Sequence, residues 1–455
     1  MLIEWKDFRS SPTCHGQEAM DSLRYQHIGE PTFVDVFAGC GGLSLGLICA
    51  GWRGIFAIER EDNAFKTLKF NLIDGDHVQQ FHWPSWLPRE PHRVSAFLRK
   101  YASQLKALRG AIDLVVGGPP CQGFSYAGRR KHDDPRNRMF EQFVEIVDVL
   151  RPTLVLFENV KGIATAFGKT KRKTRQNRAG RPARPFLARV RGRFEALGYS
   201  VFDDCLSASE FGVAQLRPRQ FLIGVDETRC ELGSRNPFDL IRAKRRDFLK
   251  SKGLPVDRPV TVRDAISDLE ITGKHFVPCE DSPTFNRIDY EGPETSYQRM
   301  LHAGLDGTAP NSLRLPRHKL ETIEHFTTIL KTCKKGVGLS QDDRNRLGIR
   351  KHCIVPLDPN KPSHTLTTLP DDFLHYSEPR ILTVREYARL QSFPDWYAFL
   401  GKYTTGGPQR RRECPRYTQV GNAMPPLLAQ VIGHALREIC GQARVESEKV
   451  RAYAS

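Results

Sequence analysis

The fold is decided by residues 31–50, which read PTFVDVFAGCGGLSLGLICA. The apolar run at 31–38 predicts a buried strand, the glycines at 39–42 a tight turn, and residues 43–50 a helix. A second strand at 54–59 and a helix through residue 70 repeat the pattern, and further strands are expected at 112–116, 153–157 and 221–225. A helical pattern covers 139–150. Short apolar strands that alternate with helices predict an α/β fold built on a doubly wound, mostly parallel sheet.

The composition is that of a globular, basic protein. The chain has 455 residues, 39% of them hydrophobic, and a formal net charge of +17. No apolar run approaches the ~18 residues of a membrane span, and the first residues lack the apolar core of a signal peptide. The positive charge indicates either a polyanionic partner such as nucleic acid or simply a basic enzyme.

The eleven cysteines include no Cys-x-x-Cys pair, so neither a zinc site nor a thioredoxin-type motif is indicated. Reduced thiols of an intracellular protein are the expectation. No metal site is predicted.

Two segments depart from the strand–helix rhythm. Residues 168–193 contain eleven Lys and Arg residues and no acid, which is typical of a mobile basic loop. From about 226 to 375 the sequence is polar and punctuated by proline, which predicts a second, smaller, irregular domain.

The first candidate site is the turn Phe37-Ala-Gly-Cys-Gly-Gly42 with Glu59 at the end of the next strand. Glycines let the backbone approach a ligand, and a carboxylate at this place commonly binds ribose hydroxyls. Ser44 stands where the dinucleotide fingerprint has its third small residue, so the spacing indicates an adenosine-type cofactor rather than a nicotinamide oxidoreductase.

The second site is Gly117-Gly-Pro-Pro-Cys-Gln-Gly-Phe-Ser125, just past a predicted strand. Most cysteines are small core residues, but a Pro-Pro-Cys-Gln turn between glycines is poor core material, so Cys121 is interpreted as a nucleophile. Glu158, directly after another strand, is a candidate acid or hydrogen-bond partner, or else a solvated residue. In Gln215-Leu-Arg-Pro-Arg219, alternation places Arg217 and Arg219 on one strand face, which suits binding of phosphate or the edge of a heterocycle.

The four candidate sites are the glycine turn with Glu59, the Cys121 turn, Glu158, and the segment Gln215–Arg219. In this order they resemble the C5-cytosine DNA methyltransferase family. Two more blocks agree, one at residues 380–395 (RILTVREYARLQSFPD) and a closing block at 419–426 (QVGNAMPP). The resemblance covers residues 31–225 and 362–440. It implies an S-adenosylmethionine-dependent fold and a division into an N-terminal extension (1–30), a catalytic and cofactor-binding domain (31–225), a target-recognition domain with hinge (226–400) and a C-terminal segment (401–455) that packs back onto the catalytic domain.

The resemblance also implies roles for individual residues. Cys121 would add to carbon 6 of a cytosine flipped out of the duplex, and Glu158 would hydrogen-bond the ring while carbon 5 accepts the methyl group. The implied catalytic residues are Cys121, Glu158, Arg217 and Arg219. The implied contacts with S-adenosylmethionine are Phe37, Ala38, Gly39, Gly41, Gly42, Glu59, Pro119 and Asn422. The implied contacts with DNA or the target base are Gln122, Ser125, Arg136 and Gln215.

The chain departs from the family pattern in two places. The aspartate that contacts the adenine amine cannot be assigned, and both Asp74 and Asp76 are candidates within an enlarged stretch at 74–110. The basic segment at 168–193 is longer than usual, and either adds phosphate contacts or is a solvated insert.

The leading interpretation is a monomeric, cytoplasmic bacterial enzyme that methylates double-stranded DNA at a specific site and protects it within a restriction-modification system, beside a separate endonuclease. A tRNA-directed relative and a non-catalytic DNA-binding paralogue are the alternatives. The 160 residues between Arg219 and Arg380 are ample for a DNA-recognition region, and the catalytic residue types are all present. The DNA sequence recognised and the residues that read it cannot be predicted, although Thr365-Leu366 resembles a pair found in the family's recognition region.

Overall fold

The computed structural model describes residues 30–120, 139–164, 186–230, 232–305, 307–351, 353–405 and 413–454, with side chains up to residue 441. At its centre is a six-stranded sheet in the order β2-β1-β3-β4-β7-β5. β1 pairs in parallel with β2 and β3, and β3 with β4, whereas β7 runs antiparallel to both β4 and β5. The strands are β1 (Thr32–Val36), β2 (Arg53–Ile58), β3 (Leu114–Gly117), β4 (Leu154–Val160), β5 (Ser200–Ser207) and β7 (Pro218–Val225).

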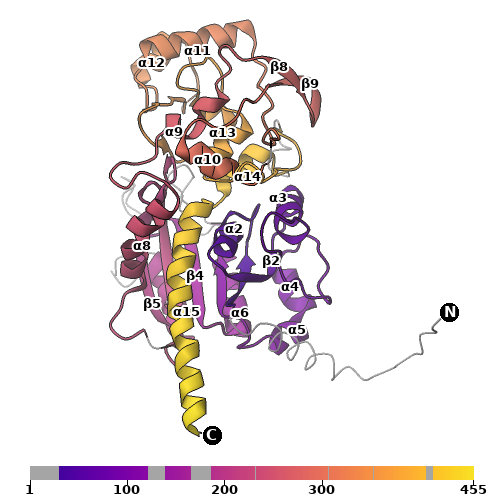
Figure 1. Ribbon diagram of the computed structural model, residues 1–455, viewed down its shortest axis with the longest axis vertical. Coiled ribbons are helices and arrows are strands. Elements are labelled where there is room, and N and C mark those ends of the chain that lie inside the picture. The colour runs from indigo at the N-terminus through magenta and orange to yellow at the C-terminus, as the bar shows by residue number, and fades with distance from the viewer. Residues whose placement is uncertain are drawn as a thin grey trace, which may run out of the picture.

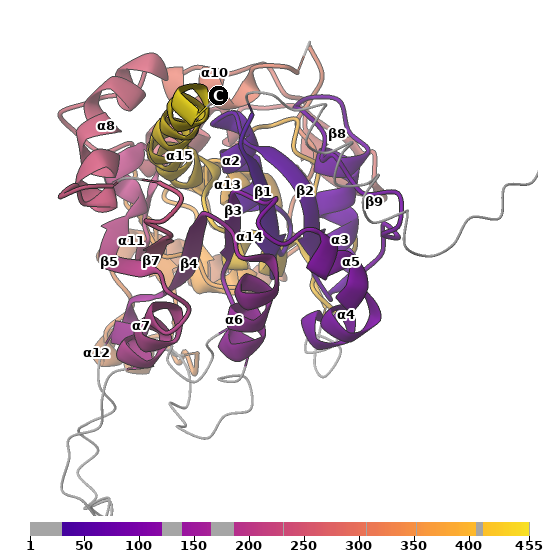
Figure 2. The ribbon, with the colours of Figure 1, turned by 90° about the horizontal axis from the view of Figure 1, so that it is seen from below.

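Helices cover both faces of this sheet, so the predicted doubly wound, mostly parallel fold is confirmed (Figures 1 and 2). One face is covered by α2 (Gly42–Cys49), α8 (Pro237–Ser251) and α15 (Pro426–Ala454), the other by α4 (Val94–Lys100), α5 (Ala102–Ala107), α6 (Met139–Leu150) and α7 (Phe186–Glu195). α3 (Asp62–Leu68) continues into η1 (Lys69–Ile73) beyond the β2 edge.

Alternate residues of the buried strands enter the two cores. On β1, Phe33 faces the α2–α15 core, while Val34 and Val36 face the α6–α7 core. Both faces of β1 are fully covered, which explains why this strand is hydrophobic apart from Thr32 and Asp35.

A second group of elements lies above the sheet (Figure 1). It contains α9 (Val262–Ile266), α10 (Ser296–His302), α11 (Leu320–Thr332), α12 (Gln341–Arg346), α13 (Val384–Leu390), α14 (Arg416–Asn422) and the hairpin of β8 (Phe276–Cys279) and β9 (Ser282–Ile288). Short pairs add β6 (Gln215–Leu216) with β11 (Ser363–His364), and β10 (Val355–Pro356) with β12 (Phe373–Leu374).

These upper elements share the larger hydrophobic core with the sheet. Tyr387, Phe393 and Tyr397 belong to the same buried cluster as Phe33 of β1. Helix α8, which a boundary at residue 225 assigns to the recognition region, packs against α15 and β5 beside the sheet.

One local prediction changes. The basic segment predicted as a loop over 168–193 ends in helix α7, which already begins at Phe186. Residues 165–185 lie outside the described part of the chain. Within α7, Arg189 and Arg193 both pair with Glu141 of α6, at 2.7 and 2.8 Å, so these two charges hold helices together.

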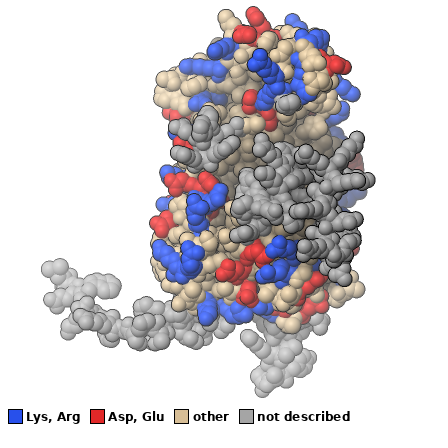
Figure 3. Space-filling view, turned by 180° about the vertical axis from the view of Figure 1, so that it is seen from behind, with Lys and Arg blue, Asp and Glu red and all other residues tan. Residues whose placement is uncertain are grey.

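Viewed from behind, Lys and Arg side chains predominate over Asp and Glu on the upper part of the molecule, while the lower part carries both in mixture (Figure 3). No helix among the described residues is long and apolar enough to cross a membrane.

Candidate active site

The turn after β1 forms a cradle at the carboxyl edge of the sheet. Phe37, Gly39 and Gly41 all have positive φ (65°, 58° and 90°), and the backbone N–H groups of Phe37 and Ala38 donate to the carbonyl of Ile58 at the end of β2. A Cβ atom added to Gly39 would meet no heavy atom of the described residues within 4 Å, so this part of the structure leaves open space against the turn.

Glu59 lies beside that space. Its Oε2 accepts a hydrogen bond from the Gly39 N–H (2.9 Å), and its Oε1 accepts from the N–H groups of Arg60 (2.7 Å) and Glu61 (2.8 Å). Burial raises the pKa of the Glu59 carboxyl, and these backbone donors oppose the shift. Oε1 already accepts two hydrogen bonds, whereas Oε2 accepts one and retains acceptor capacity, so the group fits a ribose hydroxyl of S-adenosylmethionine.

A buried carboxyl supports the turn from below. Asp35 of β1 is 1% exposed, and its Oδ2 accepts a hydrogen bond from the Ser44 hydroxyl in the first turn of α2 (2.6 Å). Its Oδ1 has no hydrogen-bond partner, and burial raises its pKa to about 7. Ser44, which departs from the dinucleotide fingerprint, therefore joins α2 to β1.

Gly41 and Gly42 face the C-terminal part of the chain rather than open space. A Cβ on Gly41 would lie 2.8 Å from Oη of Tyr397, and one on Gly42 would lie 2.2 Å from the carbonyl oxygen of Met424. Close packing of α2 against the segment that leads into α15 explains Gly42, whereas Gly41 has a positive φ and lies against the Tyr397 side chain. Their predicted contact with the cofactor stays a prediction.

The ends of β3 and β4 meet at the same edge. A Cβ on Gly118 would lie 2.6 Å from Oε2 of Glu158, and the Asn159 side-chain amide donates to the Pro119 carbonyl (3.1 Å). The backbone that leads toward Cys121 is therefore held directly against Glu158. Cys121, Gln122, Ser125 and Arg136 themselves lie outside the described residues.

Strand β7 brings the second charge to this edge. Nε of Arg219 lies 2.9 Å from Oε1 of Glu158, and both side chains are more than four-fifths buried. Burial lowers the pKa of Arg219, and the Glu158 carboxylate opposes that shift. The ion pair orients the carboxylate before any substrate arrives.

Arg217 and Asn422 come together although 204 residues separate them in the chain. Arg217 is 2% exposed and donates to the carbonyls of Gly421 (3.1 Å) and Asn422 (3.3 Å), at the end of α14. The Arg217 guanidinium thus holds the closing segment against the catalytic edge, and its Nε has no hydrogen-bond partner among the described residues. The Asn422 side chain is exposed.

Gln215 is fully buried and its amide is occupied. The amide nitrogen donates to the side-chain oxygen of Gln391 (3.0 Å), and the oxygen accepts from the N–H of Leu366 (3.0 Å). The structure therefore gives Gln215 a role in joining the upper elements to the sheet. Its predicted contact with DNA or the target base stays a prediction.

The stretch 74–110 contains a residue that sequence reasoning missed. The backbone N–H of His92 donates to the carbonyl of Glu59 (2.7 Å), so this histidine lies at the end of β2 although it is 33 positions further along the chain. Its only sequence signal is its place in the enlarged stretch. Asp74, one candidate for adenine recognition, is engaged in ion pairs with Lys69 and Arg89. Asp76 is exposed.

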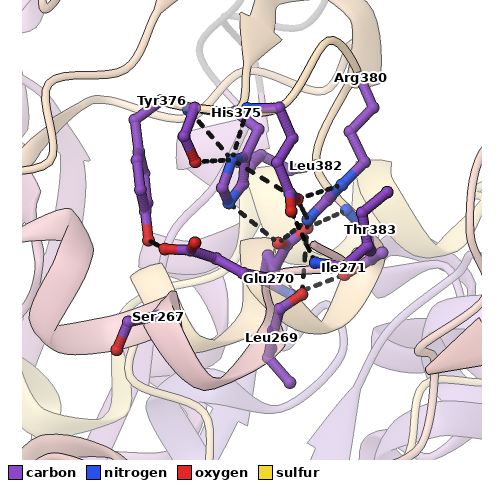
Figure 4. Close-up of polar contacts among 12 residues, drawn as sticks. Ser267, Leu269, Glu270, Ile271, His375, Tyr376, Arg380, Leu382 and Thr383 are labelled. Atoms are coloured by element: carbon purple, nitrogen blue, oxygen red, sulfur yellow. Dashed lines mark hydrogen bonds and ion pairs between the residues drawn. The ribbon is translucent and has the colours of Figure 1, made fainter. Parts of the chain in front are cut away.

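The block at 380–395 forms buried ion pairs above the site rather than lining it. Arg380 donates to both oxygens of Glu386 (2.8 Å each) and to Glu378 (2.9 Å), with His375 stacked alongside Tyr376 (Figure 4). Arg389 forms a bidentate ion pair with Asp395, in which Nε donates to Oδ1 (2.9 Å) and Nη2 donates to Oδ2 (2.7 Å). These pairs set the position of α13 and of the turn that follows it.

Among the described residues, no cluster of three or more His, Cys, Asp or Glu side chains could hold a metal ion. The polar groups at the sheet edge are those that an adenosine-type cofactor and a neutral heterocycle would require.

Comparison with known proteins agrees with this geometry. The family model for C-5 cytosine-specific DNA methylases matches residues 31–438. The type II methyltransferase M.DdeI of Desulfomicrobium norvegicum is 31% identical, with 89% of this chain and 88% of that protein covered. The type II methyltransferase M1.HphI of Haemophilus parahaemolyticus is also 31% identical, with 89% and 86% covered.

A solved structure shows the same fold. It is a prophage-encoded E. coli protein described as a DNA modification methyltransferase, with a TM-score of 0.57 and 22% identity over 90% of this chain and all of that one. The family model covers the residues that form the sheet, the cradle beside Glu59 and the Glu158–Arg219 pair. This protein is therefore a member of the C-5 cytosine-specific DNA methylase family.

Proposed function

We propose that this chain transfers the methyl group of S-adenosylmethionine to carbon 5 of cytosine within one short sequence of double-stranded DNA. The observation that carries the proposal is the Glu158–Arg219 pair, held at 2.9 Å directly beside the backbone that leads into Cys121. A carboxylate and a guanidinium fixed in this way offer an acceptor and a donor to the polar edge of a flipped cytosine.

Carbon 5 of cytosine is too weak a nucleophile to react unaided. The Cys121 thiolate adds to carbon 6, and the electron pair of the 5,6 double bond moves toward carbon 5 and the ring. The Glu158 carboxyl accepts a hydrogen bond from the exocyclic amine and shares a proton with N3, which neutralises the negative charge that develops on the ring. Arg219 keeps the carboxylate in place and contacts the target base or its phosphate.

The cofactor supplies an electrophilic methyl group on a sulfonium when it is bound. Glu59 would hold its ribose, the Phe37–Gly39 turn would lie along its methionine part, and Asn422 would reach it from the end of α14. After transfer, the carbon 5 proton passes to water and the Cys121 thiolate is eliminated, which releases 5-methylcytosine and regenerates the nucleophile.

The cellular role follows from the relatives. Type II methyltransferases are the named relatives of this chain, and a role in host protection beside a separate restriction endonuclease is the function we infer. The net charge of +17 and the predominance of Lys and Arg over Asp and Glu on the upper elements fit a DNA partner (Figure 3). We propose that the protein acts as a monomer in the bacterial cytoplasm.

The test is transfer of a labelled methyl group from S-adenosylmethionine to DNA and to tRNA by the purified chain. We expect labelling of DNA by the wild type and a loss of about a thousandfold or more in Cys121→Ser, with cofactor binding retained. Labelling of tRNA but not DNA would favour the RNA-directed alternative. Equal activity of Cys121→Ser would remove Cys121 as the nucleophile.

A further inference from the structure

An exposed ridge leads away from the catalytic edge. Strand β6 pairs in parallel with β11, which puts Leu216 beside His364, and both side chains are exposed while their neighbours Gln215 and Ser363 are buried. The Thr365 hydroxyl donates to the Leu216 carbonyl (2.8 Å), which fixes this edge further.

The His364 side chain continues the ridge into the segment 334–338. Its Nε2 donates to the carbonyl of Gly336 (2.7 Å), and the Gly336 N–H donates to the carbonyl of Pro356 (2.7 Å). The Leu339 N–H donates to Ile354 (3.0 Å) at the other end. This short glycine-containing segment is thus held at its base, and its tip can present side chains without further ordering cost.

The exposed side chains of this segment and of Leu216 include large apolar groups, which are unfavourable in contact with water. Val337 is 40% exposed and Leu216 is 43% exposed, two of the five large apolar side chains that stand out from the described surface. Lys334 is exposed and Lys335 is half-buried. Asp358, which also pairs with Lys361 (3.2 Å), lies near Gly336 and interacts electrostatically with Lys335, so the segment carries one acid beside its two lysines. Apolar groups beside an excess of cations form a surface that is complementary to the sugars, base edges and phosphates of a nucleic acid.

We propose that this junction ridge (Leu216, Lys334, Lys335, Val337 and His364) is a contact surface for the DNA duplex next to the flipped cytosine. The inference rests on the proposed function. The position of the ridge argues for it, because Leu216 directly precedes Arg217 and lies three residues before Arg219, whose guanidinium holds Glu158. Because side chains alternate along a strand, Leu216 points to the side opposite the buried Gln215 and Arg217. Arg217 therefore faces the catalytic edge, and Leu216 faces the outer surface.

Surface labelling tests the contact directly. Val337→Cys is alkylated with a maleimide, with and without a duplex that the wild type methylates, and the modified position is read by mass spectrometry. The matched control is Leu320→Cys on α11, where the native side chain is 79% exposed. We expect the duplex to slow alkylation at position 337 at least tenfold and to leave position 320 unchanged.

Equal rates at position 337 with and without the duplex would overturn the proposal. Slow alkylation at 337 without any DNA would also overturn it, because another part of the chain would then cover the ridge.

Binding measurements separate the ridge from the catalytic machinery. Leu216→Ala and Val337→Ala should each raise the Kd for the duplex by about tenfold, as expected for losing a few buried methyl groups. The affinity for S-adenosylmethionine should stay unchanged, and Leu320→Ala should bind DNA like the wild type.

The two lysines should act through charge. Replacing Lys334 and Lys335 together by Gln should make the slope of log K against log salt shallower by about 2. Unchanged DNA affinity and slope in all these variants, in a preparation whose wild type methylates DNA, would refute the ridge and leave the proposed function intact. Failure of the wild type to methylate or bind DNA would refute both.

Discussion

The substitution Gly42→Ala tests the contact between helix α2 and the segment that leads into α15. On an exposed helix, replacing Gly by Ala stabilises by about 1 kcal/mol. Here the new Cβ would lie 2.2 Å from the Met424 carbonyl oxygen and 3.0 Å from Cζ of Phe393. The Met424 carbonyl belongs to the backbone and cannot rotate away as a side chain can. The next turn of α2 lies equally close to α15, since a Cβ on Gly46 would lie 2.4 Å from the Cβ of Ala429.

Because α2 and α15 would have to separate along their contact, we expect Gly42→Ala to destabilise the protein by about 3 kcal/mol, the upper end for overpacking. Urea unfolding followed by circular dichroism measures this as a lower midpoint with an unchanged slope.

The matched variant is Gly39→Ala. None of the residues that the structure describes has a heavy atom within 4 Å of that Cβ, so only the positive φ opposes it, at about 1–2 kcal/mol. The methyl group would instead enter the cradle beside Glu59. We expect S-adenosylmethionine affinity, measured by calorimetry, to fall about tenfold or more in Gly39→Ala. If Gly42→Ala is neutral or stabilising, Gly42 does not serve the packing of α2 against the segment that leads into α15. If Gly39→Ala binds the cofactor normally, Gly39 does not border the cofactor site.

Three further predictions concern charged groups. Glu158→Gln should lower the single-turnover rate of methyl transfer by about 10²–10³-fold with cofactor affinity unchanged, because an amide stabilises the developing ring charge poorly; a wild-type rate would remove Glu158 from the chemistry. Burial raises the pKa of Asp35 to about 7, so between pH 4 and 7 the folded state binds more protons than the unfolded one, and stability should fall as the pH rises through 7. Asp35→Asn should flatten that decline in a series of urea midpoints, and an equally steep decline in the variant would contradict the assignment. Asp395→Ala should lower the free energy of unfolding by about 3–5 kcal/mol, because it leaves Arg389 buried without its main partner. The control Asp343→Ala breaks an exposed ion pair with Arg346 and should lower it by less than about 1 kcal/mol. Similar losses of stability in both variants would refute the importance of the buried pair.

Local patterns along the chain were enough to predict the sheet and its catalytic edge. The apolar run that ends in glycines became β1 and α2, and the helix expected at 139–150 is α6. These elements are fully covered by neighbours, so their hydrophobic periodicity is strong. Glu59 and Glu158 could be singled out because side chains at the ends of parallel strands converge on one edge.

Other features depend on partners that are remote in sequence. Strand β5 was missed because most of its residues are half-exposed and polar, which weakens the apolar signal of an outer strand. The start of α7 was hidden by the basic composition around it. That Gln215 is buried follows from Gln391, 176 residues away, and no local rule reveals such a pairing.

The central claim is that this chain methylates carbon 5 of cytosine in a defined DNA sequence. Bisulfite sequencing of DNA from cells that express the wild type, beside cells that express Cys121→Ser, tests it most directly. The account predicts protected cytosines confined to one short motif, and only with the wild type. Unmethylated DNA from cells that contain folded, cofactor-binding wild type would contradict it.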